Sequence, residues 1–148
     1  TAITTASTNV YAVYTTGEVQ EGTRQVNIIA LSGRGMFEAL AQFDSNVICN
    51  FTDRSTAFLS PDERHLATFG HIVDLLSGEV VYEYGGESGL VTWVDETTFV
   101  YDESTCNAVP DTGGGEVWLV NLTNQTQVNL SDNTAGAAWL LAQGTTMR

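Results

Sequence analysis

Two neighbouring segments in the middle of the chain carry the clearest structural pattern: Thr56-Ala57-Phe58-Leu59-Ser60-Pro61-Asp62-Glu63-Arg64-His65-Leu66-Ala67-Thr68-Phe69 and Ile72-Val73-Asp74-Leu75-Leu76-Ser77-Gly78-Glu79. The first is typical of strand, turn and strand, because Pro61 fixes φ and Asp62 offers a side-chain acceptor. The second is typical of a strand that runs into a tight polar turn, and residues 79–84 supply a further strand. Together they predict a unit of four short strands.

The same pattern recurs on either side of this unit. Val26-Asn27-Ile28-Ile29-Ala30-Leu31-Ser32-Gly33 and Val117-Trp118-Leu119-Val120-Asn121-Leu122-Thr123-Asn124-Gln125 both resemble the second segment. Alignment of Leu31, Leu76 and Leu122 gives spacings of 45 and 46 residues, close to the ~40–50 residues of a four-stranded repeat. We therefore expect one domain of three repeat units. They span about residues 9–45, 46–86 and 87–133.

Strand patterns fill the rest of the chain, because short apolar runs are interrupted by Gly, Ser, Asn and Asp and none keeps a long stripe of helical period. Residues 35–43 have good helix propensity, but Phe37, Ala39, Ala41 and Phe43 alternate, and we read this segment as a strand. The sequence therefore predicts an all-β protein. The other predicted strands span residues 9–15, 25–31, 55–60, 64–69, 71–76, 79–84, 90–94, 97–102, 116–121, 125–130 and 137–142.

The motifs of the middle unit resemble those of a known repeat family. Phe58-Leu59-Ser60-Pro61-Asp62-Glu63, followed by Val73-Asp74-Leu75-Leu76-Ser77-Gly78-Glu79, is similar to the TolB-type or WD40-like propeller repeat. In that repeat Ser-Pro-Asp-Gly and Val-Asp-x-x-Thr-Gly mark the two hairpins of a blade, and here Glu63 stands in the place of the Gly. The resemblance covers about residues 9–142. It implies a β-propeller-like array of about three four-stranded antiparallel blades, with a period of about 45 residues.

The charge balance excludes several classes of function. The chain has 18 Asp and Glu residues against 5 Arg and no Lys, and its formal net charge is -13. Nucleic acid is excluded as a partner, because its binding depends on Lys and Arg at the phosphates. The absence of Lys also excludes a Schiff-base mechanism, a P-loop lysine and a polybasic membrane patch. An acidic surface either keeps the protein soluble or attracts cations or a basic partner.

Cysteines and glycosylation sequons favour an extracellular or cell-surface protein. Cys49 and Cys106 are enough for one disulfide and too few for a zinc site. No apolar run approaches the ~20 residues of a membrane span, and the first residues lack the regions of a signal peptide. We therefore expect a mature chain or an excised piece of a longer one. Asn-x-Ser/Thr sequons occur at Asn50, Asn121, Asn124 and Asn129.

No residue pattern predicts catalysis or a bound cofactor. Gly86-Glu87-Ser88-Gly89 resembles the nucleophile turn of chymotrypsin-like proteases, but the available bases, His65 and His71, lie too close in sequence, and we interpret the segment as a turn. The two histidines lack a third metal ligand and are interpreted as strand-end residues. Ca²⁺ held by acidic loops is the alternative to solvated loop charges. The loop residues concerned are Asp95, Glu96, Asp102, Glu103 and Asp111.

These observations favour a non-catalytic binding or assembly module of a secreted or cell-surface protein, which presents its acidic loops to a protein partner. Two alternatives stay open. One is a structural subunit of an extracellular assembly that exchanges terminal strands, and the other is the non-catalytic propeller portion of a larger hydrolase.

The two ends of the chain predict self-association. In the repeat frame the first unit lacks its innermost strand, and residues 1–8 form a flexible or strand-donating arm. Residues 137–142, with Trp139, fit an innermost strand whose blade does not follow. Three units cannot form a ring of the ~4–8 blades that propellers use. We therefore expect residues 137–142 to pair with residues 9–15 of a second copy, or with chain outside this sequence, which makes the protein a homo-oligomer or part of a longer chain.

Overall fold

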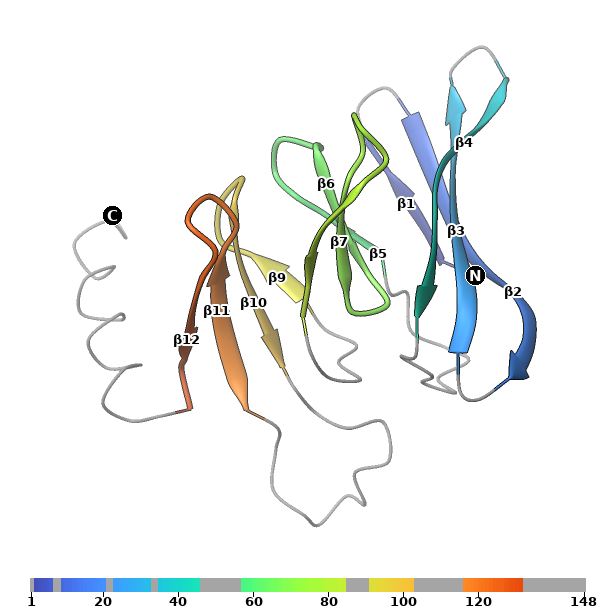
Figure 1. Ribbon diagram of the computed structural model, residues 1–148. Coiled ribbons are helices and arrows are strands. Elements are labelled where there is room, and N and C mark those ends of the chain that lie inside the picture. The colour runs from blue at the N-terminus through green and yellow to red at the C-terminus, as the bar shows by residue number, and fades with distance from the viewer. Residues whose placement is uncertain are drawn as a thin grey trace.

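The protein is all-β in the residues that its structure, a computed structural model, describes: 2–6, 9–20, 23–32, 35–45, 57–84, 91–102 and 116–131. These ranges contain three four-stranded antiparallel sheets and no helix. The sheets lie side by side with the second between the other two, and they are not closed into a ring (Figure 1). The all-β prediction is confirmed.

Each sheet is a meander, in which every strand pairs with the next strand along the chain. The backbones of the sheets approach each other most closely at their first strands, because β1 contacts β5 and β5 contacts β9. Sheet 1 contains β1 (Ala2–Thr5), β2 (Asn9–Gln20), β3 (Thr23–Ser32) and β4 (Phe37–Ser45). Sheet 2 contains β5 (Ala57–Leu59), β6 (His65–Thr68), β7 (His71–Asp74) and β8 (Val80–Glu83). Sheet 3 contains β9 (Val91–Trp93), β10 (Thr98–Asp102), β11 (Val117–Asn121) and β12 (Thr126–Asn129).

Sheet 2 buries both of its faces. Successive residues of a strand point to opposite sides of the sheet. Leu66 and Val73 pack against sheet 1, whereas their neighbours Ala67 and Ile72 pack against sheet 3, and all four side chains are 0% exposed. Two core clusters result, one between sheets 1 and 2 and one between sheets 2 and 3.

Two β-bulges change which side chains face the core. In β4 the register with β3 shifts at Leu40, which is the extra residue. Ala41 and Phe43 therefore face sheet 2, whereas Phe37 and Ala39 face away from it. The strand reading of residues 35–43 is confirmed, but the four alternating apolar residues do not share one face, because the bulge reverses the alternation. The register of β8 with β7 contains a similar shift.

Sheets 2 and 3 repeat the same hydrogen bond across their turns. Leu75 N donates to Arg64 O in sheet 2, and Leu122 N donates to Thr97 O in sheet 3, at 2.8 Å in each case. These equivalent bonds pair Leu75 with Leu122, a separation of 122 − 75 = 47 residues. The alignment of Leu76 with Leu122 was therefore one residue out, and Leu76 lies in the turn with 85% of its surface exposed.

Strand β1 corrects the arrangement expected at the start of the chain. It pairs with β2 from Ala2 opposite Val13 to Thr5 opposite Val10, so sheet 1 has its first strand and the expected absence of that strand is wrong. Strand β2 pairs with β1 on one side and with β3 on the other, so residues 9–15 have no open edge. The expected pairing of this strand with a second copy is therefore also wrong. All the other predicted strands overlap observed ones, except 137–142, which lies outside the described residues.

We expect Gly78→Ala to destabilise the protein more than Gly35→Ala does. Both glycines have positive φ, 75° and 73°, which costs an L-residue about 1–2 kcal/mol. A Cβ at Gly78 would also overlap the carbonyl oxygen of Leu40, whereas Gly35 has open space around it. In urea titrations the free energy of unfolding should fall by about 2–4 kcal/mol for Gly78→Ala and by about 1 kcal/mol for Gly35→Ala. Equal losses would contradict the close packing of Gly78 on β4.

Candidate interaction surface

The side of sheet 1 that points away from sheet 2 is apolar. In β2 Tyr11 and Val13 point into the core, so the residues between and beside them point outward. Two rows of paired residues cross all four strands on this side. The first row is Ile3, Ala12, Ile29 and Ala39, and the second is Thr5, Val10, Leu31 and Phe37. We call these eight residues the outer face of sheet 1.

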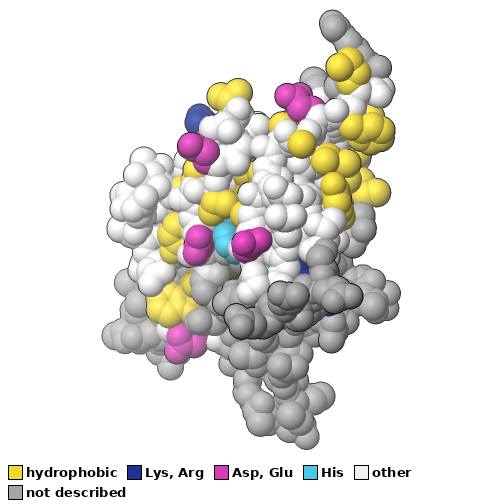
Figure 2. Space-filling model, turned by 45° about the vertical axis from the view of Figure 1, so that its right-hand side comes forward, with side chains coloured by type: hydrophobic (Ala, Val, Ile, Leu, Met, Phe, Trp, Pro, Cys, Tyr) yellow, Lys and Arg dark blue, Asp and Glu magenta, His cyan; other side chains and the backbone are white. Residues whose placement is uncertain are grey.

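The outer face is open to solvent and carries no charge. Phe37 is 72% exposed and Ile3 is 64% exposed, and these two residues lie on strands at opposite edges of the sheet. Figure 2 shows apolar side chains gathered along the upper right of the molecule, on the side that sheet 1 occupies in Figure 1. Exposed apolar faces are uncommon on soluble monomeric proteins, and in other proteins they often belong to interaction sites. Such a face is all the more unusual on a chain with a net charge of -13.

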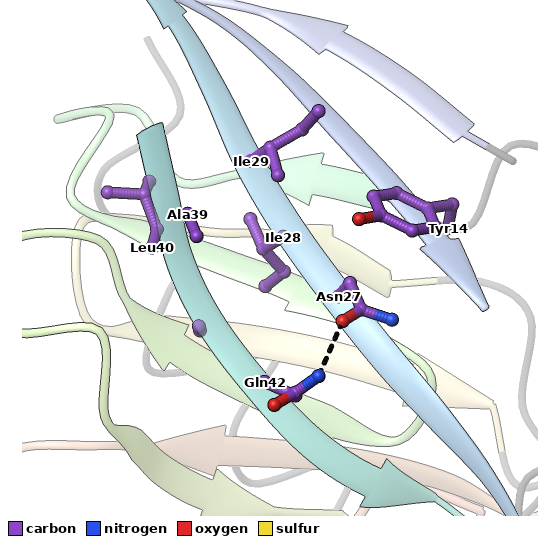
Figure 3. Close-up of a pocket in the computed structure, with 8 residues that line it drawn as sticks. Tyr14, Asn27, Ile28, Ile29, Ala39, Leu40 and Gln42 are labelled. Carbon is purple, nitrogen blue, oxygen red and sulfur yellow. Dashed lines mark hydrogen bonds between the residues drawn. The ribbon is translucent and has the colours of Figure 1, made fainter. Parts of the chain in front are cut away.

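A neutral polar network borders the outer face. The next row across the sheet is Tyr14, Asn27 and Gln42. Gln42 Nε2 donates to Asn27 Oδ1 at 2.8 Å (Figure 3). Asn27 Nδ2 in turn donates to Thr16 Oγ1 at 3.0 Å. These side chains form hydrogen bonds with one another, so this polar border of the outer face contains no charged group.

A hollow of about 260 Å³ lies where the outer face meets this network. It forms beside the bulge at Leu40, because the extra residue separates the side chains on either side of it. The amide groups of Asn27 and Gln42 lie at one end of the hollow, and its other lining residues are mostly apolar. The lining residues are Tyr14, Asn27, Ile28, Ile29, Ala39, Leu40, Ala41 and Gln42 (Figure 3).

A second, acidic surface lies at the turns after β5 and β9. Pro61 of the first turn and Val94, Asp95, Glu96 and Thr97 of the second line one shallow hollow, so the two turns are neighbours. Of the acidic loop residues that were identified in the sequence and that the structure describes, Asp95 and Glu96 lie here and Asp102 does not. Strand β10 separates this pair from Asp102, which lies at the other end of the strand. Glu103, Asp111 and Trp139 lie outside the described residues.

Asp62 and Asp95 use their carboxylates within these turns. Asp62 accepts hydrogen bonds from Ser60 Oγ and Arg64 N, and Asp95 accepts the N–H groups two and three residues further on, at 2.8 and 2.7 Å. Burial alone would raise the pKa of both carboxyls, but these hydrogen bonds outweigh it and hold each pKa below its ordinary value of 3.8. Both groups are therefore charged at neutral pH, and their negative charge is fixed in place.

Asp74 holds the corresponding turn at the end of β7. Its Oδ1 accepts the N–H groups of Leu76 and Ser77, at 2.8 and 3.2 Å. Its Oδ2 accepts two hydrogen bonds from Arg64, from Nε at 3.0 Å and from Nη2 at 2.9 Å. Burial would raise the pKa of Asp74, but the bonds from Arg64 and from the two backbone groups outweigh it and lower that pKa. The equivalent residue of sheet 3 is Asn121, whose Oδ1 accepts the same two kinds of backbone bond.

The two histidines are held by packing contacts. The His65 ring stacks on Trp93 with the ring centroids 6.0 Å apart. His71 Nδ1 lies 2.6 Å from Phe69 O, so this nitrogen donates, and the His71 ring lies 4.5 Å from the Phe43 ring. In the part of the chain that the structure describes, no three His, Cys, Asp or Glu side chains are grouped so that they could hold a metal ion.

The remaining sequence predictions fall partly outside the described residues. Cys49, Cys106 and Asn50 lie there, so the predicted disulfide stays a prediction. Asn121 donates from Nδ2 to Thr98 Oγ1 at 3.0 Å, whereas Asn124 is exposed in the turn between β11 and β12. The sequon at Asn129 also lies in sheet 3. None of the described segments forms a helix able to cross a membrane.

Comparison with known proteins gives no match: no family model fits the chain, and no curated protein is significantly similar to it. Sequence reasoning did not identify the outer face of sheet 1. A signal was present in β3, where Ile28 and Ile29 are consecutive and apolar, so that one of them faces away from the core.

We expect Asp74→Asn to cost less stability than Asp74→Ala, because an Asn side chain keeps the turn acceptor that Asn121 provides in sheet 3. Asp74→Asn loses the ion pair with Arg64 and should lower the free energy of unfolding by about 1 kcal/mol at neutral pH. Asp74→Ala also leaves two N–H groups without an acceptor and should cost about 2–3 kcal/mol. Urea titrations of both variants measure this, and equal losses would contradict the shared turn role.

The same variants test the pH dependence. A carboxyl whose pKa is lower in the folded state stabilises the protein above its unfolded pKa, and that contribution is lost as the pH falls through the folded pKa. The difference in stability between wild type and Asp74→Asn should therefore shrink as the pH is lowered from about 6 to about 2. A difference that stays constant over this range would contradict the lowered pKa of Asp74.

Proposed function

We propose that the protein is a non-catalytic binding and assembly module. In this proposal its three sheets are blades of a propeller of the TolB-type or WD40-like kind. The outer face of sheet 1 is its docking surface for another protein. The exposed, uncharged apolar face is the observation that carries this proposal.

The burial of sheet 2 supports a sheet as the partner on this face. Each face of sheet 2 is covered by a neighbouring sheet, through Leu66 and Val73 on one side and Ala67 and Ile72 on the other. Sheet 1 has the same strand order and has such a neighbour on one side only within the described residues. The open side therefore calls for an apolar, sheet-like partner surface.

The acidic turns supply a second feature of the proposal. Asp62 and Asp95 place fixed negative charge on the turns after the first strands of sheets 2 and 3, and Glu96 lies next to Asp95. Negative charge at the rim of a binding module repels acidic competitors and speeds the approach of basic partners. The sequons support an extracellular location as part of the same proposal.

The docking surface is tested with a fluorescent dye that binds exposed apolar protein surface. At submicromolar protein we expect dye fluorescence with the wild type and a several-fold lower signal for the double variant Ile3→Asp/Phe37→Asp. Leu76→Asp is the matched control, because Leu76 is an even more exposed apolar residue but lies on a turn of sheet 2. Both substituted positions are exposed, so the free energy of unfolding should change by less than about 0.5 kcal/mol per substitution. A double variant that keeps the wild-type signal would refute this docking surface.

A further inference from the structure

We infer that Asn124, in the turn between β11 and β12, is the residue of sheet 3 that carries an N-linked glycan. The inference rests on the extracellular location in the proposed function and selects one acceptor among the sequons. N-linked glycans are joined to the Asn side chain of an Asn-x-Ser/Thr sequence in secreted proteins. The described residues contain three such sequences, at Asn121, Asn124 and Asn129, and Asn50 lies outside them.

The side chain of Asn124 is held by its oxygen and leaves its nitrogen free. Oδ1 of Asn124 accepts hydrogen bonds from Thr126 N at 3.1 Å and from Thr126 Oγ1 at 2.6 Å. A backbone N–H can only donate, so the amide atom that it contacts is the oxygen. No group of the described residues accepts a hydrogen bond from Asn124 Nδ2. The atom that would be joined to the sugar is therefore available.

The turn around Asn124 has room for a bulky group. Residues 123–127 are all exposed, and the turn lies at one end of sheet 3 (Figure 1). A glycan is large and well hydrated, so it requires a surface position of this kind. Sheet 2 packs between sheet 3 and sheet 1, and a glycan on this turn would leave the outer face of sheet 1 uncovered.

Asn121 begins the neighbouring sequon, but both atoms of its side-chain amide have partners in the folded sheet. Its Nδ2 donates to Thr98 Oγ1 at 3.0 Å, and Thr98 is only 7% exposed. Its Oδ1 accepts the N–H groups of Thr123 and Asn124. A sugar on Asn121 Nδ2 would lie against a buried partner, and glycans on both Asn residues would crowd one turn.

Asn129 lies within strand β12 and is half-buried. It is opposite Trp118 in the ladder, so it shares the side of sheet 3 that faces sheet 2. Its Oδ1 accepts the N–H of Ser131 at 2.8 Å, and the hydroxyl oxygen of Ser131 accepts the N–H of Val117 at 2.8 Å. A glycan on Asn129 would compete with these contacts, and we expect this residue to stay unmodified.

The separation of the contacting residues along the chain also favours Asn124. Asn124 and Thr126 are two residues apart, and a contact of this kind forms in a short segment without the rest of the sheet. Asn121 and Thr98 are 23 residues apart, so their contact forms only when β10 and β11 pair. A glycan added to Asn124 before folding is therefore compatible with the folded sheet, whereas one on Asn121 would oppose the contact with Thr98.

The covalent step is the transfer of an oligosaccharide to nitrogen. A bond forms between Asn124 Nδ2 and C1 of the first sugar, and the bond between that C1 and the pyrophosphate of a lipid-linked oligosaccharide breaks. The lipid pyrophosphate leaves with the electron pair of the broken bond, and Nδ2 gives up one proton. The lipid-linked oligosaccharide is the co-reactant that this step requires.

The test is secretion of the full chain, behind a cleavable signal peptide, from a eukaryotic cell line. The amidase that releases N-linked glycans converts each modified Asn to Asp, and in heavy-oxygen water it labels that residue for peptide mass spectrometry. We expect at least tenfold higher occupancy at Asn124 than at Asn121 or Asn129.

Two exposed threonines of the same turn supply matched variants. Thr126→Ala removes the sequon of Asn124 and should abolish the glycan of this turn. Thr123→Ala removes the sequon of Asn121, leaves the contact between Asn121 and Thr98 in place, and should keep the glycan. Thr126→Ser keeps both the sequon and the hydroxyl and should also keep it. Asn124→Gln repeats the comparison if Thr126→Ala is not secreted.

The outcomes separate this inference from the docking function. A secreted wild type with unmodified Asn124, or a glycan that Thr123→Ala removes and Thr126→Ala does not, overturns the assignment of Asn124. Dye binding to the outer face of sheet 1 is measured on the same protein before and after release of the glycan, and we expect a change of less than twofold. A larger rise would contradict the placement of the glycan away from sheet 1. An unmodified Asn124 with normal dye binding refutes the glycosylation site and leaves the docking surface standing.

Discussion

The arrangement of the molecule depends on the two-sided apolar character of sheet 2. Its central strands place Leu66 beside Ala67 and Ile72 beside Val73, and a strand sends neighbouring residues to opposite faces. Water must be excluded from both sides, so a sheet of this kind is stable only with a cover on each side. Sheets 1 and 3 supply these covers, and each of them then has a second side of its own.

Aspartate side chains stabilise the turns that connect the strands of sheets 2 and 3. Asp62 accepts one backbone N–H group within its turn, and Asp74 and Asp95 accept two each, which satisfies donors that the strand ladders leave unpaired. Charged acceptors make these bonds stronger than neutral ones. Much of the acidity that the sequence displays in these turns is therefore structural, and the uncharged face of sheet 1 is the better candidate for recognition.

Sequence pattern was sufficient for the strands and turns of sheets 2 and 3, because the Ser60-Pro61-Asp62 turn and the Asp74 turn have strong local preferences. It was insufficient for β1, since Ile3 is the one large apolar residue in a segment of Ala and Thr, and pairing with β2 decides its structure. The outer face was missed for a related reason. The bulge at Leu40 depends on contacts with β3 and Gly78, and it alone places Phe37 and Ala39 on the outer side.

The edges of the sheets favour association through faces over exchange of strands. An open edge strand pairs readily with another chain unless it is short or interrupted. The first strands β1, β5 and β9 have only 4, 3 and 3 residues. Of the last strands, β8 and β12 have 4 residues each and β4 has 9. The pairings of β4 and β8 each contain a bulge, which twists the edge and breaks the register that a new strand would need. With these edges blunted, the docking contact that we propose is made by the outer face of sheet 1, where side chains rather than backbone groups would form the contact.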